Sequence, residues 1–445
     1  MLENRSFDHF LGSIPKVDGV DPQKPGQNRE SPASSRIYKQ TPDAVRVLQP
    51  DPMHDVNNVL RQIHGDGDLG PMGGFVYDYS HAYRQNPNQW AQVMSYFPLG
   101  SLPALHTLAR AFCMCDRWFS SVPGPTWTNR FFAHSGTSQG WVNMPEPPFH
   151  WNLHRYDQTT IYDRLNERNV SWAIYAGDIP QSLLLFNQRQ PQNLRRYYRM
   201  PTFYADVHNT AEEQFPAYTF IEPSYLPVGA RNDQHPPHDV LNGDDLIGSV
   251  YNALRANSEL WDSTLLIVTW DEHGGFYDHA MPPNPAAPPD QNAQEGFAFN
   301  EYGVRVPSLL ISRWVLPGSV FRADEGVIEH TSVLRYLIDR FSLGPLTKRV
   351  GSVASIGTAI VTSPNEDTPA QVGQSTTSGQ GLFETGQLVF NRNQVALMDF
   401  AKFLETQSGV DLEVIGQNTI REASSPRAAV EVAIDRVWRF IDGNP

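Results

Sequence analysis

The chain has 445 residues, a net charge of -14 at pH 7 and a sequence pI near 5.4. An acidic surface repels the phosphates of nucleic acids and of anionic membranes, so we expect no nucleic-acid partner. No run of about eighteen apolar residues is present, and the sequence therefore predicts no transmembrane segment.

Four short apolar runs bounded by turn residues predict buried strands at 171–176, 218–221, 265–270 and 307–311. Between the second and third runs, apolar residues recur at helical spacing, namely Leu246, Val250, Ala253 and Leu254. A second helical pattern at 332–341 follows the fourth run. This order of elements predicts an α/β fold whose central sheet is mostly parallel and covered by helices on both faces.

The last hundred residues have a different character. Residues 361–380 are rich in Thr, Ser, Gln, Pro and Gly, which predicts an exposed or mobile loop. Two helices are expected after it. The first has an apolar face formed by Leu397, Phe400, Ala401 and Leu404. The second begins with Ser425 as N-cap and Pro426 at its first position.

Two acidic pairs far apart in the sequence come where strands are expected to end. Glu3-Asn4 follows Met1 and Leu2, and Asp271-Glu272 follows the predicted strand 265–270. Ligands bind at the carboxyl ends of strands in open α/β sheets, and carboxylate and amide oxygens suit a hard divalent cation. Gly274 and Gly275 would let the chain turn so that both acidic residues reach one ion. The alternative is that each pair is a solvated strand end.

Thr126 lies at an expected strand-to-helix turn, after Gly124-Pro125 and before an apolar helical run. A hydroxyl at a helix N-terminus lies beside free backbone amides, which can hold a phosphate and favour an alkoxide. The alternative is that Thr126 or Thr128 caps the helix.

Four histidines stand near these segments: His54, His235, His238 and His330. Imidazoles can bind phosphate oxygens, protonate a leaving alkoxide or bind a metal, although a structural role is the common one for any single histidine. The two cysteines, Cys113 and Cys115, are expected to be structural, because no second cysteine cluster completes a zinc site.

Seven motifs in order resemble the phosphoesterase family of bacterial and plant non-specific phospholipases C and the related acid phosphatase, within the alkaline-phosphatase-like superfamily. They are Glu-Asn-Arg-Ser-Phe-Asp-His at 3–9, Gly-Pro-Thr-x-x-Asn-Arg at 124–130, Ile-Glu-Pro at 221–223, His-Pro-x-His-Asp-Val at 235–240, Asp-Glu-His-Gly-Gly-Phe-Tyr-Asp-His at 271–279, Gly-Val-Arg-Val-Pro-Ser at 303–308 and Glu-His-Thr-Ser at 329–332.

This resemblance implies an alkaline-phosphatase-like three-layer α/β sandwich with a mostly parallel central sheet and a C-terminal helical extension. The catalytic domain is expected at 1–350, and an extension with a loop and two helices at 351–445. Family members usually carry a hydrophobic strand before the Glu-Asn motif, whereas only Met1 and Leu2 precede it here. We therefore expect this strand to be missing or drastically shortened.

The resemblance also implies the roles of site residues. The metal ligands would be Glu3, Asn4, Asp271, Glu272 and Thr126, with Thr126 as the nucleophile. His54, His238 and His330 would surround the phosphate and the leaving group, with His235 ranked below His238. The divalent metal is expected to be calcium, magnesium, manganese or zinc.

The function that this resemblance implies is a metal-dependent hydrolase of phosphate esters, of phospholipase C type, acting through a phosphothreonine. Its substrate would be a phospholipid or a small phosphate ester. The alternatives are an acid-phosphatase-like phosphomonoesterase and an N-terminally truncated, non-catalytic remnant. A signal sequence upstream of Met1 would indicate a secreted or periplasmic enzyme, and its absence a cytoplasmic one.

Overall fold

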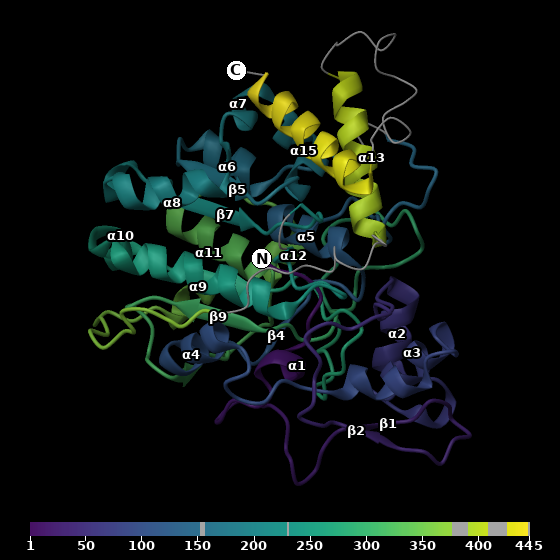
Figure 1. Ribbon diagram of the computed structural model, residues 1–445. Helices are drawn as coiled ribbons and strands as arrows, with labels where there is room; N and C mark the ends of the chain where they lie inside the picture. The colour runs from purple at the N-terminus through teal and green to yellow at the C-terminus, as the bar shows by residue number, and fades with distance from the viewer. Residues whose placement is uncertain (152–155, 229–230, 376–389, 408–424, 444–445) are drawn as a thin grey trace.

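The computed structural model describes residues 1–445 except 152–155, 229–230, 376–389, 408–424 and 444–445 (Figure 1). Its strands are β1 Gln27–Asn28, β2 Tyr38–Lys39, β3 Cys113–Met114, β4 Trp118–Phe119, β5 Trp172–Ala176, β6 Tyr197–Arg199, β7 Tyr218–Glu222, β8 Leu266–Thr269, β9 Ser308–Ile311, β10 Ser319–Val320 and β11 Ile328–Glu329.

The α-helices among the described residues are α1 Phe7–Leu11, α2 Val56–His64, α3 Phe75–Ala82, α4 Pro103–Ala111, α5 Thr126–Ser135, α6 Ile161–Glu167, α7 Pro191–Leu194, α8 Met200–Asn209, α9 Val240–Ala256, α10 Ser258–Ser263, α11 Thr331–Phe341, α12 Lys348–Ser352, α13 Arg392–Gln407 and α15 Pro426–Asp442. The four strands and the helices predicted from apolar spacing are all present, within a residue or two at the strand ends. The fold is therefore mixed α/β.

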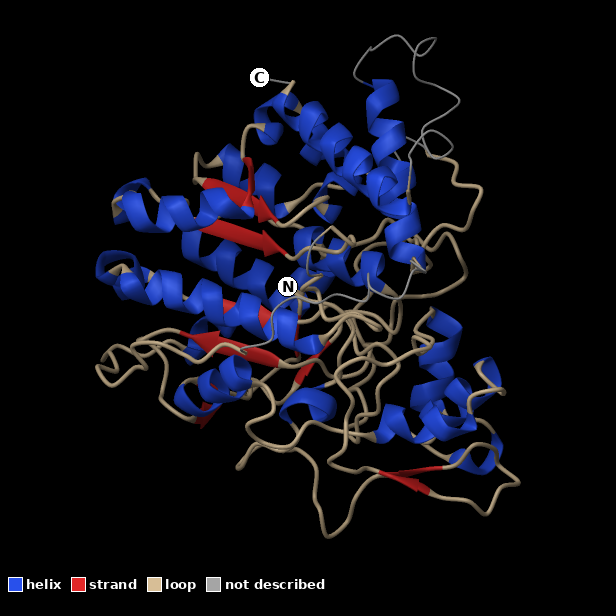
Figure 2. Ribbon diagram, in the orientation of Figure 1, coloured by secondary structure: helices blue, strands red, loops and turns tan. Residues whose placement is uncertain are grey.

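Two sheets form the centre of the molecule (Figure 2). One has the order β6-β5-β7 and is parallel throughout. The other has the order β10-β3-β9-β8, and in it β3 and β8 both run antiparallel to β9. The prediction of a mostly parallel arrangement is therefore wrong for the β10-β3-β9-β8 sheet. The chain between β8 and β9 contains no helix to cross over the sheet, and a parallel pair needs such a crossover.

Met1 and Leu2 lie between these two sheets. The Met1 nitrogen donates a hydrogen bond to the Ile221 carbonyl at 3.2 Å, next to the end of β7. Leu2 forms a parallel bridge with Trp270, directly after β8. Met1 and Leu2 therefore connect the two sheets, Met1 through β7 and Leu2 through a single bridge after β8.

Helices cover both faces of the β6-β5-β7 sheet. Successive side chains of β5 point to opposite sides of the sheet, so they pack against both helical layers. Trp172, Ile174 and Ala176 pack into a core with residues of α5, α6 and α11. Ala173 and Tyr175 pack on the other face with residues of α8 and α9. Burial on both sides explains why this strand is a continuous apolar run instead of an alternating one.

The C-terminal helices α13 and α15 pack against each other at one end of the molecule (Figure 1). Leu397, Phe400, Ala401 and Leu404 of α13 are buried in the same core as α5, and the Ser425 side chain caps α15 by accepting from the Ala428 amide. Residues 361–375 contain no helix or strand, as predicted, and 376–380 lie outside the described residues. Within the described ranges, no helix is long and apolar enough to cross a membrane.

Candidate active site

The two acidic pairs meet at one edge of the sheets. The bridge between Leu2 and Trp270 leads directly into Glu3-Asn4 on one side and Asp271-Glu272 on the other. The Asn4 amide donates to Asp271 Oδ1 at 3.1 Å, and the Arg5 amide donates to the Glu272 carbonyl at 3.0 Å. The two acidic pairs, which are far apart in the sequence, therefore lie in contact as predicted.

Left-handed backbone conformations within the first pair and after the second make this approach possible. Asn4 has φ +63°, a conformation that asparagine tolerates better than most residues, and Gly274 also has φ +63°. A Cβ atom at Gly274 would lie 2.4 Å from the Asn4 carbonyl oxygen. A side chain at position 274 would thus force the two segments apart.

Thr126 is the first residue of α5, and the N-cap position belongs to Pro125. Thr126 is 1% exposed, and its hydroxyl has no hydrogen-bond partner among the described residues. By contrast, the Thr128 hydroxyl donates to the Val142 carbonyl at 2.9 Å. Neither threonine caps the helix with its side chain. Thr126 is therefore the hydroxyl that is free to act on a ligand.

Four of the five predicted metal-ligand residues carry a buried oxygen without a partner in the described part of the chain. These atoms are Glu3 Oε2, Asn4 Oδ1, Thr126 Oγ1 and Glu272 Oε1. Leaving buried polar atoms unpaired is costly, and such atoms concentrate where a ligand completes the structure. Carboxylate, amide and hydroxyl oxygens are the donors that a hard divalent cation takes, so this donor set fits a metal.

Arg130 of α5 contacts two of the buried carboxylates. Its side chain is 2% exposed and lies 3.3 Å from Glu3 Oε1 and 3.1 Å from Asp271 Oδ2. Asp271 Oδ1 accepts from the backbone amides of Asn4 and Glu272, so each oxygen of this carboxylate has a partner within the protein. Burial raises the pKa of Glu272 to about 8 and raises that of Glu3 against the opposing charge of Arg130. A bound cation would favour the ionised form of both.

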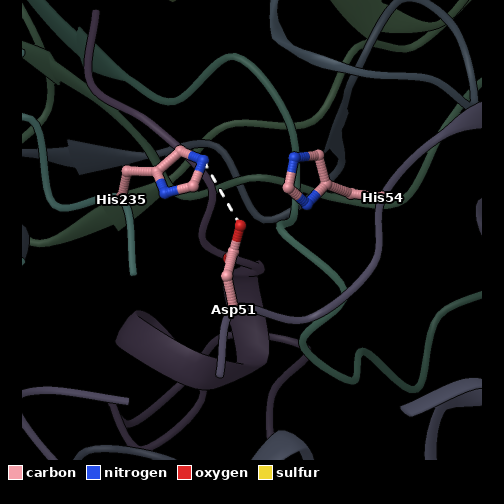
Figure 3. A group of neighbouring side chains, drawn as sticks. All are labelled: Asp51, His54 and His235. Carbon is pink, nitrogen blue, oxygen red and sulfur yellow. Dashed lines mark ion pairs between the residues drawn. The ribbon is translucent and has the colours of Figure 1, made fainter. Parts of the chain in front are cut away.

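A second group of ligand-type side chains consists of Asp51, His54 and His235 (Figure 3). One nitrogen or oxygen of each lies within 4.8 Å of the others. The two rings flank the Asp51 carboxylate, with His235 Nε2 3.7 Å from Asp51 Oδ2. The His54 Nε2 atom is 3.4 Å from Asn4 Nδ2, which connects this group to the first acidic pair.

Backbone carbonyls fix the tautomers of both imidazoles. Nδ1 of His54 donates to the Pro52 carbonyl at 2.7 Å, and Nδ1 of His235 donates to the Pro236 carbonyl at 2.6 Å. Burial lowers the pKa of His235 well below its usual range, so its ring is neutral. The neutral His235 ring therefore presents an unprotonated Nε2, which can accept a proton or bind a cation.

A cavity of about 150 Å³ brings the nucleophile candidate and these histidines together. It is lined by Asp51, His54, Thr126 and His235, with others including Asn391, Arg392 and Asn393. A more open hollow of about 430 Å³ shares Asp55, Met144 and Arg392 with it. A small phosphate group would fit the cavity, and a larger substituent could extend into the hollow.

His238 and His330 are not among the residues that line the cavity. His238 Nδ1 bonds to Asp233 Oδ1. His330 donates from Nε2 to the Asp271 carbonyl at 2.6 Å and accepts at Nδ1 from Trp118 at 3.2 Å. Both nitrogens of His330 thus have partners, and Nε2 holds the backbone at Asp271. His235, ranked below His238 from the sequence, is the one that faces the cavity.

Four further residues contact the site without having been predicted from the sequence: Asp51, Arg130, Asp233 and Asn393. Asp51 is three residues before His54, and Asp233 is two residues before His235, so spacing to a histidine was an available signal. Arg130 lies within a quoted motif. Asn393 donates to Glu3 Oε1 from 390 residues away, and no local pattern points to it.

A third cluster, Asp8, Asp278 and His279, also has metal-like spacing, but Arg305 occupies it. The fully buried Arg305 side chain donates to Asp278 Oδ1 at 2.9 Å and to Asp8 Oδ1 at 3.1 Å. The cluster is therefore a buried ion network that braces the loop after the second acidic pair.

We expect His279→Gln to destabilise the protein more at pH 6.5 than at pH 9.5. Burial lowers the pKa of His279, but its hydrogen bond and attraction to Asp8 outweigh this and raise it to about 9. The stabilisation is full below the unfolded pKa of about 6.5 and is lost as pH rises through about 9. Because the ring is 31% exposed, we expect a loss of about 1–2 kcal/mol at pH 6.5.

Urea unfolding at both pH values measures this effect, with the exposed His208→Gln as matched control. A difference between variant and wild type that stayed the same from pH 6.5 to pH 9.5 would contradict a protonated His279.

Comparison with known proteins identifies the family of this chain. A model of the phosphoesterase family matches residues 1–344. Non-specific phospholipase C6 of Arabidopsis thaliana is 35% identical over 391 residues, covering 83% of this chain and 73% of its own length. Phospholipase C B of Mycobacterium tuberculosis is 28% identical over 406 residues, covering 77% and 72%. Non-hemolytic phospholipase C of Pseudomonas aeruginosa is 25% identical over 380 residues, covering 77% and 53%. The chain therefore belongs to the phosphoesterase family and is a phosphoric ester hydrolase.

Proposed function

We propose that this protein is a divalent-metal-dependent phospholipase C that acts through a phosphothreonine at Thr126. The observation that carries the proposal is the buried, unpartnered Thr126 hydroxyl in the lining of the histidine-bearing cavity. Relatives named as phospholipases C support a phospholipid as substrate. The open hollow beside the cavity supports a diester that carries a head group.

Glu3, Asn4, Glu272 and Thr126, together with Asp271, would hold the metal through oxygen atoms. When bound, the metal supplies positive charge that stabilises the phosphoryl oxygens in the transition state. Arg130 fixes Asp271 and Glu3 in place, and His330 fixes the Asp271 backbone. We assign calcium, magnesium or manganese a better fit than zinc, because every one of these donors is oxygen.

The reaction would take two displacements at phosphorus. Thr126 Oγ1 attacks phosphorus while its proton passes to Nε2 of His54 or His235. The bond from phosphorus to the glycerol oxygen breaks, and the imidazole returns the proton to the departing diacylglycerol. A water molecule then attacks the phosphothreonine, the bond from phosphorus to Oγ1 breaks, and the phosphorylated head group is released with the Thr126 hydroxyl restored.

We also infer the architecture of the whole protein. Helices on both faces of the β6-β5-β7 sheet support an alkaline-phosphatase-like three-layer sandwich. Residues 1–350 would form the catalytic domain, and 351–445 a C-terminal extension packed on it through α13 and α15.

The test is hydrolysis of phosphatidylcholine vesicles and of p-nitrophenyl phosphate, before and after chelation. We expect phosphocholine release that EDTA abolishes and that calcium, magnesium or manganese restores. Release of phosphate from the monoester alone would indicate the phosphomonoesterase instead. Silence on both substrates from folded, metal-supplied protein would indicate a non-catalytic remnant.

A further inference from the structure

The chain enters α13 against the candidate active site, although this segment lies beyond residue 344, where the family model ends. Asn393 is 3% exposed and Gln394 is 1% exposed, which is unusual for polar side chains at the first turn of a helix. Asn391 and Asn393 also line the 150 Å³ cavity. These side chains therefore face the site rather than solvent.

Asn393 joins two elements of the site through one amide group. Its Oδ1 accepts from Trp127 Nε1 at 2.8 Å, and its Nδ2 donates to Glu3 Oε1 at 3.3 Å. The orientation of the amide is fixed by chemistry, because an indole nitrogen only donates and a carboxylate only accepts. Trp127 directly follows Thr126, so the same side chain connects the helix of the nucleophile to the first acidic pair.

The partners of Glu3 divide its two oxygens. Oε1 is held by Gln181 Nε2 at 2.7 Å, by Asn393 and by Arg130 at 3.3 Å. Oε2 is buried and has no partner among the described residues. A carboxylate clamped through one oxygen presents the other in a fixed direction, which is the way outer-shell groups orient metal ligands.

The start of α13 is itself held in place. Asn391 and Gln394 exchange hydrogen bonds, since each side-chain oxygen accepts from the backbone amide of the other residue at 3.0 and 2.8 Å. This is the reciprocal pattern of a capping box, which fixes where a helix begins. The Gln394 Nε2 also donates to the Tyr225 carbonyl at 2.6 Å and lies 3.3 Å from His238 Nε2. The Asn391–Gln394 turn therefore holds Asn393 in contact with Glu3.

We propose that Asn393 is a positioning residue for the metal ligand Glu3, so that the C-terminal extension completes the active site. The inference rests on the proposed function, because it takes Glu3 as a ligand. Its role differs from that of Gln181 and Arg130, which lie within the residues matched by the family model. Loss of Asn393 would leave Glu3 Oε1 with two donors and leave the buried Trp127 Nε1 without an acceptor.

The test is calorimetric titration of Mn²⁺ into the chelator-stripped full chain, with Asn393→Leu as the main variant. Leucine has the same number and branching of non-hydrogen side-chain atoms as asparagine but makes no hydrogen bond. We expect Mn²⁺ to bind about 10-fold more weakly, in the range that outer-shell substitutions produce. Asn393→Ala should behave in the same way.

Two further variants serve as the negative and the positive control for Mn²⁺ binding. Lys402→Ala, on the exposed side of α13, should leave Mn²⁺ affinity unchanged. Glu3→Gln should lose most Mn²⁺ binding. Wild-type affinity in Asn393→Leu, alongside loss in Glu3→Gln, would overturn the positioning role alone. Wild-type affinity in Glu3→Gln would overturn the metal assignment and this inference together. A drop in melting temperature without a change in affinity would show a structural role only.

Discussion

Thr126→Ala should reduce turnover by about 10⁴-fold or more while the protein stays folded. Removing a nucleophile eliminates the covalent route and leaves only the contribution of binding and charge. The Thr126 hydroxyl makes no hydrogen bond within the described structure, so its loss costs no folding interaction. The measurement is kcat for phosphatidylcholine hydrolysis, together with the melting temperature of the variant.

Thr128→Val is the matched control, because Thr128 lies two residues further along the same helix and is equally buried. Its hydroxyl donates to Val142, so this variant should lose about 1–2 kcal/mol of stability yet keep its activity. Thr126→Ser should retain turnover, since a hydroxyl remains. Wild-type rates in Thr126→Ala would remove Thr126 from the mechanism.

Arg305→Met should destabilise the protein by about 3–5 kcal/mol, the cost of leaving buried carboxylates without their cation. Arg305 is fully buried and bonds to Asp8 and Asp278. It also donates to the Asp18 and Asp116 carbonyls at 2.8 and 2.7 Å. Methionine fills a similar volume, so the loss would report charge and hydrogen bonds rather than a cavity. Urea unfolding at pH 7 measures it.

Arg335→Ala is the control for this prediction, because its ion pair with Asp339 is exposed on α11 and should contribute less than about 1 kcal/mol. Adding Asp278→Asn to Arg305→Met should recover part of the lost stability, since it removes one unpaired buried charge. Equal stability of the two single arginine variants would contradict the bracing role of the Arg305 network.

Local pattern was sufficient for the elements that bury a regular face. The apolar run before Asp271 became β8, the run at 218–221 became β7, and the spacing of Leu397, Phe400 and Leu404 became the buried face of α13. The direction of strand pairing could not be predicted from such local patterns. The sequence suggested a mostly parallel sheet, yet β8 and β9 are antiparallel, because strand direction depends on the path of the connection and not on the strand residues.

The residues of the site divide in the same way. The sequence determined the chemical groups and their local geometry: an acidic pair after a strand, glycines that permit the turn at Gly274, and a threonine at the start of a helix. Only the tertiary structure decided that His235 lines the cavity and His238 does not, and that Asn393 reaches Glu3. The physical reason is range: hydrophobic periodicity and turn preferences act between near neighbours, whereas hydrogen bonds across hundreds of residues exist only after the chain has packed.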